Sequence, residues 1–141
     1  MCQTVLWAIN AHSFTERFVA ETASRLGVAP QDTELRIKSS RVRSSSRHFE
    51  LVPNMCNCGS LVGLGPGKKP SDGLDPQTLI AWLHVLPSIA AHVSRIAILN
   101  CWSPAEAEIV PRRASGIQVS QLAEQTLRSL PGDSLLTIDY R

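Results

Sequence analysis

The chain has 141 residues, the size of one ordinary domain, and 43% of them are hydrophobic while 18% are charged. This balance excludes a disordered chain, and a net charge of only +2 excludes a protein that attracts polyanions through its overall charge. We therefore expect a single globular domain over residues 1–141.

The N-terminal stretch MCQTVLWAIN has a short apolar run with no basic segment before it. A secretory signal or a membrane span would need a longer apolar run, and a signal would also need that basic segment. We therefore expect a cytoplasmic protein that does not enter a membrane. In a reducing compartment its four cysteines should be free thiols or metal ligands rather than structural disulfides.

The first half of the chain predicts three strands and a helix. Residues 4–9 are apolar and partly β-branched, which is typical of a buried strand. The capping box at residues 13–16 predicts the start of a helix, and Gly27 has the residue type that ends one. Two further strands are expected at residues 34–43 and 47–52, joined into a hairpin by a serine-rich turn.

A central helix and a second buried strand follow. Asp75 is a typical N-cap and Pro76 a typical first helical residue, so a helix should begin here and run towards His92. Pro87 should kink or restart that helix, because proline has no N–H and clashes with the preceding turn. Residues 96–99 are uninterruptedly apolar and predict a strand.

The last part of the chain predicts two helices and a closing strand. A capping box at residues 103–106 predicts a helix of about two turns, which Pro111 would end. Spaced apolar residues predict a helix over residues 119–130, and residues 135–140 predict a strand. The order β-α-β-β-α-β-α-β favours an α+β fold with a ferredoxin-like split βαβ core and an added αβ unit, in which neighbouring core strands are antiparallel.

Three segments carry a resemblance to a known family. These are Leu-Gly-Val-Ala-Pro at residues 26–30, Gly-Ile-Gln-Val-Ser-Gln-Leu at residues 116–122 and Thr-Ile-Asp-Tyr at residues 137–140. The chain resembles a family of small bacterial domains of unknown function, some of which look like immunity proteins that neutralise a partner toxin. The resemblance implies a non-enzymatic protein that binds a protein partner, although the chain departs from the pattern at residues 56–59 and 108–113.

The cysteines are the first candidate site. In the expected topology Cys2, Cys56, Cys58 and Cys101 all fall at the same edge of the sheet, and four thiolates would suit Zn²⁺, Cu⁺ or an iron–sulfur cluster. The Cys-x-Cys spacing is tighter than the usual zinc spacing. A metal site, a redox or disulfide role for Cys56 and Cys58, and inert buried thiols therefore all stay open.

A run of cations is the second candidate site. Residues 36–47 contain Arg36, Lys38, Arg41, Arg43 and Arg47 and no acidic residue, which suits an anionic partner, either an acidic protein surface or a phosphate backbone. The other interpretation is a solvated sheet edge that prevents aggregation. Nucleic-acid binding is not supported, because no aromatic side chains alternate with the arginines.

The glycine-rich stretch after the cysteines fails as a phosphate-binding loop. Val62 stands where the first glycine is required and Lys69 where a serine or threonine should hold Mg²⁺, so a flexible connector is expected. No histidine, serine or carboxylate pattern has catalytic spacing. We therefore expect a non-enzymatic, immunity-type binding protein without a required cofactor, with a small metal-binding or thiol-redox protein as the alternative.

Overall fold

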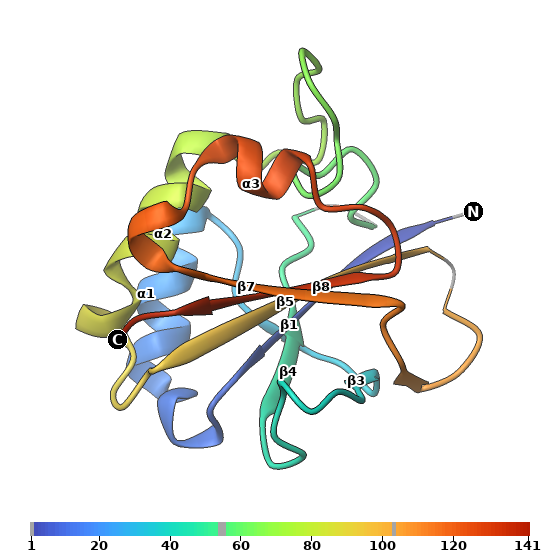
Figure 1. Cartoon of the computed structure of the whole chain (residues 1–141). Helices are drawn as coiled ribbons and strands as arrows, with labels where there is room; N and C mark the ends of the chain where they lie inside the picture. The colour runs from blue at the N-terminus through green and yellow to red at the C-terminus, as the bar shows by residue number, and fades with distance from the viewer. Residues whose placement is uncertain (1, 54–55, 103) are drawn as a thin grey trace.

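A computed structural model describes residues 2–53, 56–102 and 104–141, and its strands form a mixed, mostly antiparallel sheet backed by helices (Figure 1). The six strands of the main sheet are β1 (Gln3–Ile9), β2 (Gln31–Asp32), β4 (Arg47–Glu50), β5 (Arg95–Trp102), β7 (Arg113–Gln118) and β8 (Ser134–Asp139). The helices are α1 (Glu16–Leu26), α2 (Pro76–Ile89) and α3 (Glu124–Arg128), with 3₁₀ turns at Ala11–Ser13 and Val119–Gln121. The α+β class expected from the sequence is confirmed.

The strand order in the sheet is β2-β4-β1-β5-β8-β7, and only β7 and β8 run parallel to each other. A separate pair, β3 (Arg36–Ile37) and β6 (Glu108–Ile109), is also parallel. The central strands β1 and β5 are paired from Gln3 opposite Trp102 to Ile9 opposite Ile96. Nearly all of their side chains are buried, as expected of central strands that are covered on both faces.

The larger core lies between the helices and one face of the sheet. Trp7 of β1 meets Trp82 of α2 edge to face, with 5.4 Å between the ring centroids, and Phe18 of α1 packs against Phe49 of β4. The indole N–H of Trp82 donates to the buried hydroxyl of Thr22 at 2.9 Å. Aromatic residues from two helices and two strands therefore fix the helical layer on the sheet.

A smaller core covers the opposite face without any α-helix. Its buried residues are Leu6, Ala8, Ile37, Val42, Ala97, Leu99, Cys101 and Leu135. Ile37 and Val42 belong to the segment between β2 and β4, which crosses this face and buries an apolar side chain at each of two points. The cationic residues of the same segment consequently lie above this face.

The predicted hairpin over residues 34–52 does not form. Within residues 34–43 only Arg36–Ile37 is a strand, and it pairs with β6, whereas β4 pairs with Gln31–Asp32. The reason is that Ile37 and Val42 are buried on the sheet face, so the segment runs across the sheet instead of alongside β4. The ferredoxin-like topology is accordingly not confirmed, and the parallel pairing of β7 with β8 departs from an all-antiparallel arrangement.

Two predicted helix starts are wrong. Helix α1 is capped by Thr15, whose hydroxyl accepts from the Phe18 N–H, while Ser13 is buried and donates to the carbonyl of Ala91 at 2.6 Å. In residues 104–110 the structure has the short strand β6 and no helix, and residue 103 lies outside the described residues. An exposed helix there would leave Ile109 unburied, whereas β6 packs Ile109 against the smaller core.

Helix α2 begins as predicted, with the Asp75 carboxylate accepting from the Thr78 N–H at 3.0 Å, but it continues through Pro87 and ends at Ile89. Pro87 has no N–H to give to the carbonyl of Leu83, four residues earlier. The hydroxyl of Tyr140 donates to that carbonyl at 2.6 Å, so the lost helical hydrogen bond is replaced by a tertiary one. None of the helices within the described residues is both long and apolar enough to cross a membrane.

A candidate thiol site beside the central strand

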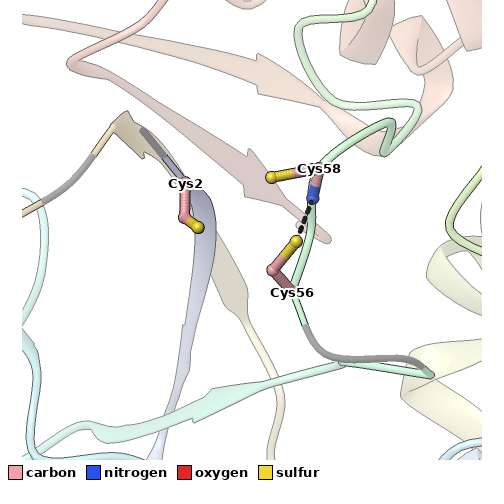
Figure 2. Close-up of side chains that lie close together, drawn as sticks. All are labelled: Cys2, Cys56 and Cys58. Carbon is pink, nitrogen blue, oxygen red and sulfur yellow. Dashed lines mark hydrogen bonds between the residues drawn. The ribbon is translucent and has the colours of Figure 1, made fainter.

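Three of the four cysteines lie together where β1 begins. The sulfur atoms of Cys2, Cys56 and Cys58 are all within 4.8 Å of one another (Figure 2). Cys2 directly precedes β1, whereas Cys56 and Cys58 lie on the loop between β4 and α2. The structure thus brings together three of the residues that the sequence singled out.

Asn57 attaches the cysteine loop to β1. Its side-chain oxygen accepts from the backbone N–H of Val5 at 3.0 Å, and its side-chain nitrogen donates to the carbonyl of Leu51 at 2.9 Å. Asn57 is itself buried. The two hydrogen bonds hold Asn57 inside the protein, and the sulfur atoms of its neighbours Cys56 and Cys58 lie close to that of Cys2 (Figure 2).

Gln3 fixes the other half of the site. Its backbone N–H donates to the sulfur of Cys58 at 3.4 Å. Its buried side-chain amide donates to the carbonyl of Val62 at 2.7 Å and to the side-chain oxygen of Asn100 at 2.9 Å. The backbone next to Cys2 is therefore held by contacts to the cysteine loop and to β5.

Gly59 closes the loop directly after the cysteines. It has a φ of +80°, and a Cβ atom added there would lie only 2.0 Å from the hydroxyl oxygen of Ser71. The N–H of Ser71 donates to the carbonyl of Gly59 at 2.9 Å, which brings the two ends of the glycine-rich loop together. Only glycine suits both the positive φ and this close approach.

The glycine-rich loop is packed, not loose as the sequence predicted. Leu61 and Val62 are both buried. The N–H of Gly63 donates to the carbonyl of Leu127, and the guanidinium of Arg128 donates to the carbonyls of Gly65 and Lys68. The loop that carries the cysteines is therefore hydrogen-bonded to α3 through its backbone groups.

The two loop thiols differ in acidity. The pKa of Cys58 is lowered, first because the Cys56 thiol donates a hydrogen bond to its sulfur and second because the Gln3 N–H does so. The pKa of Cys56 is raised, since the same hydrogen bond holds its proton. The Cys58 N–H also donates to the Cys56 sulfur at 3.4 Å. Cys58 is therefore the more acidic thiol of the pair, and thiolates are the form that binds metals and attacks electrophiles.

Cys101 does not join this group. It is buried in the smaller core, and its thiol donates to the carbonyl of Thr4 at 3.5 Å. Burial raises its pKa to about 11, which keeps it protonated at neutral pH. The fourth cysteine thus has the character of a small buried hydrophobic residue.

The cations that were predicted to bind a partner are all exposed, but they do not lie on one hairpin. These residues are Arg36, Lys38, Arg41, Arg43 and Arg47. Arg47 pairs with Asp32 and lies over the ring of Phe14, 4.4 Å from its centroid. The ammonium of Lys38 lies 3.9 Å from the carboxylate of Glu108. The run of charge in the sequence is therefore divided in space, and acidic residues from other segments partly neutralise it.

Sequence reasoning missed Asn57 and Gln3, the residues that position the thiols. In the sequence the one sign of such a role is that a polar residue, Asn57, stands between Cys56 and Cys58. The hydrogen-bond partners Val5 of Asn57 and Asn100 of Gln3 lie in distant segments of the chain. Comparison of the chain with protein-family models, with curated proteins and with solved structures gave no match.

Proposed function

We propose that this protein binds a thiophilic metal ion, Zn²⁺ or Cu⁺, through Cys2, Cys56 and Cys58. The observation that supports the proposal is the convergence of three sulfur atoms from two separate segments to within 4.8 Å. Cysteine thiolates are the preferred protein ligands of both ions. The lowered pKa of Cys58 makes the loss of its proton to a bound metal easier.

The sulfur separations suit such an ion after a small adjustment. Sulfurs bound to zinc at about 2.3 Å in tetrahedral geometry are roughly 3.8 Å apart. The three thiols therefore need to approach by no more than about 1 Å, which small changes of cysteine side-chain torsions provide. Three protein ligands leave one position of a tetrahedral ion for water or an external ligand, and they complete the shell of a trigonal Cu⁺.

Titration of the reduced protein with Co²⁺, an optical substitute for zinc, tests this proposal. We expect one equivalent to bind with thiolate charge-transfer absorption. Cys2→Ser, Cys56→Ser and Cys58→Ser should each weaken binding by roughly a hundredfold or more, because each removes one of only three ligands. Cys101→Ser is the matched control and should bind like the wild type. Absence of the absorption in the wild type, or an equal loss in Cys101→Ser, would overturn the proposal.

A second candidate function is binding of a protein partner, in keeping with the immunity-type resemblance. Exposed Arg36 lies on β3, which pairs with β6, and Val110 directly after β6 is 68% exposed. Arginine next to exposed apolar side chains is a common composition of protein interfaces. Where a toxin gene lies next to the gene of this protein, reversing the charge with Arg36→Glu and Lys38→Glu should weaken binding to that toxin. Unchanged affinity of that pair would contradict this second candidate.

A further inference from the structure

A row of small side chains crosses the sheet face that carries no helix. Ala8 of β1 is paired with Ala97 of β5, Ala97 with Thr137 of β8, and Thr137 with Gly116 of β7. Paired residues of neighbouring strands share one face of a sheet. Four adjacent strands therefore present only alanine, threonine and glycine at this level.

The levels on either side of the row carry larger groups. On one side lies the row of paired leucines Leu6, Leu99 and Leu135. On the other side, Arg95 of β5 is paired with Asp139 of β8. The small residues between them form the floor of a trough, and a cavity of about 510 Å³ lies over its β1 and β5 part.

The cavity has a strongly cationic lining: Arg41, Arg43, Arg95 and Arg141, with Asp139 as the acidic side chain among the lining residues. Serine hydroxyls and the Asn10 amide add further polar groups. The cavity lies at the end of β1 that is remote from the cysteines, because Ala8 and Ile9 line it while Cys2 precedes the strand. Seven residues of strand span about 23 Å, so this cavity is separate from the thiol site.

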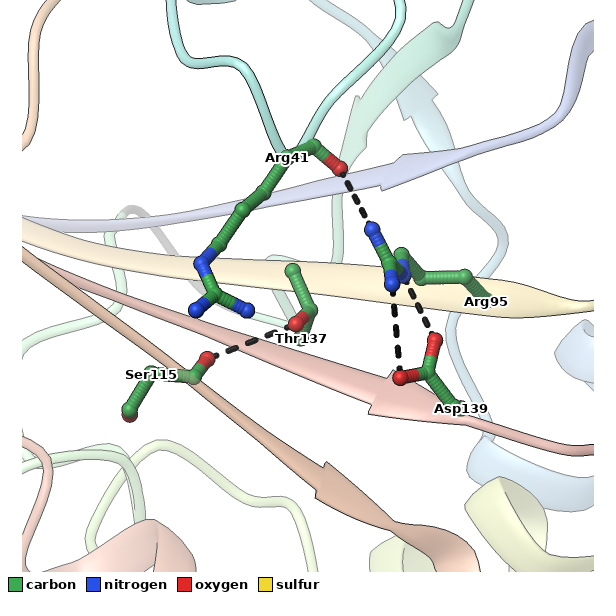
Figure 3. Close-up of polar contacts among 5 residues, drawn as sticks. All are labelled: Arg41, Arg95, Ser115, Thr137 and Asp139. Carbon is green, nitrogen blue, oxygen red and sulfur yellow. Dashed lines mark hydrogen bonds and ion pairs between the residues drawn. The ribbon is translucent and has the colours of Figure 1, made fainter.

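Asp139 is already engaged by Arg95. The guanidinium Nε of Arg95 donates to one carboxylate oxygen at 2.6 Å, and a terminal nitrogen donates to the other at 3.3 Å (Figure 3). The remaining terminal nitrogen of Arg95 donates to the backbone carbonyl of Arg41 at 3.2 Å. The acidic residue therefore holds Arg95 and, through it, the backbone that carries Arg41.

The guanidinium of Arg41 lies in the trough above β8 and β7 (Figure 3). A Cβ atom added at Gly116 would come within 2.9 Å of a terminal nitrogen of Arg41, which shows how closely this side chain follows the floor. In the ranges that the structure describes, no carboxylate forms an ion pair with Arg41 or Arg43. Arg41 and Arg43 both line the cavity, and neither has an ion pair there with a carboxylate.

We propose that this cavity binds the phosphoryl group of a small, hydroxyl-bearing molecule. A doubly charged phosphoryl group neutralises Arg41 and Arg43 together, and the planar guanidinium forks match its oxygen geometry. The cavity volume falls within the range of small-molecule sites, and the serine hydroxyls suit the polar remainder of the ligand. This assignment does not depend on the metal proposal.

Isothermal titration with inorganic phosphate at constant ionic strength tests the assignment, with malonate as a dicarboxylate in a parallel arm. We expect saturable phosphate binding that Arg41→Gln and Arg43→Gln each weaken at least roughly tenfold, the loss of one charge-assisted contact. Arg17→Gln on the exposed surface of α1 removes the same charge elsewhere and should change nothing. Gly116→Ala displaces Arg41 at unchanged net charge and should also weaken binding.

Two results would overturn the assignment: absence of saturable phosphate binding, or equal weakening by Arg17→Gln, which would indicate attraction by overall charge only. Tighter binding of malonate than of phosphate would overturn the choice of a phosphoryl ligand. Arg43 is exposed on a turn, so its variant gives a readout even where substitution of Arg41 disturbs folding.

Discussion

The side-chain oxygen of Asn57 accepts a hydrogen bond from the backbone N–H of Val5 at 3.0 Å, and this contact joins the cysteine loop to the central strand. Asn57 also donates to the carbonyl of Leu51, the residue directly after β4. One buried amide thus satisfies two backbone groups and sets the position of the thiols on both sides of it. The arrangement of the cysteines depends on a residue that has no thiol chemistry of its own.

Replacing Asn57 with alanine should lower the free energy of unfolding and increase the distances between the sulfur atoms of Cys2, Cys56 and Cys58. The Val5 N–H and the Leu51 carbonyl would lose their partner in a buried environment, which costs about 1–3 kcal/mol. Urea denaturation measures the loss, and the Co²⁺ titration should show weaker binding. Asn10→Ala is a suitable control, because the Asn10 side chain accepts from the exposed N–H of His12 and lies at the other end of β1 from the cysteine loop. Wild-type stability and Co²⁺ affinity in Asn57→Ala would refute this account of the loop.

Cys58 should be the first of the loop thiols to react with iodoacetamide as the pH is raised. Its pKa is lowered by hydrogen bonds from the Cys56 thiol and the Gln3 N–H, whereas the pKa of Cys56 is raised. Alkylation rates for each cysteine, followed by peptide mass spectrometry across pH, measure the order. Cys101 should stay unmodified in the folded protein, because it is buried and its pKa is raised to about 11.

The Cys56→Ala variant checks the cause of this difference. Removing the thiol donor should raise the pKa of Cys58 and slow its alkylation at neutral pH, while Cys101→Ala should have no such effect. If Cys56 reacts first in the wild type, the direction of the hydrogen bond between the two thiols is opposite to the one described.

The sequence predicted the elements that are buried on both faces. Exposure of long apolar runs to water is unfavourable, so such runs become buried strands. Three of them, at residues 4–9, 96–99 and 135–140, form the adjacent strands β1, β5 and β8. Strand β7 was missed because its residues are mostly exposed and carry no apolar pattern. The two-residue strands β3 and β6 exist only through their mutual pairing, which local sequence does not encode.

The candidate thiol site was predictable only in part. Cys2, Cys56 and Cys58 were placed together because the start of one strand and the end of another were expected at the same sheet edge, and the structure brings them together. Cys101 was expected there too, but its side chain enters the smaller core. The anchoring role of Asn57 could not be predicted, because its partner Val5 is 52 residues away in the chain.

Replacing Tyr140 with phenylalanine should destabilise the protein through helix α2. The Tyr140 hydroxyl donates to the carbonyl of Leu83, which Pro87 leaves without its helical partner. Loss of that donor should cost about 1–3 kcal/mol, because the carbonyl is then unpaired in the protein interior. In a Pro87→Ala background the alanine N–H can bond to Leu83, so the same substitution should cost less. Equal losses in both backgrounds, measured by urea denaturation, would disprove the compensation.

His48 should make the protein less stable as the pH falls. This buried side chain accepts the N–H of Ile37 at 3.1 Å, and its pKa is lowered from 6.5 to about 4, first by burial and second by the charge of Arg36. Between these two pKa values the unfolded chain binds a proton that the folded protein does not, so the free energy of unfolding decreases as pH drops from about 6.5 to about 4. The full effect is roughly 3 kcal/mol, at about 1.4 kcal/mol for each pKa unit.

Chemical denaturation of the wild type and of His48→Gln at several pH values between 4 and 7 measures this contribution. Glutamine retains a hydrogen-bond acceptor for the Ile37 N–H but does not titrate, so the variant should lose less stability than the wild type over the same interval. The difference between the two curves isolates His48 from the carboxylates, which titrate in both proteins. If the free energy of unfolding falls equally with pH in both proteins, His48 has the same pKa in the folded and unfolded states. Burial then does not disfavour the charged ring at this face of the sheet.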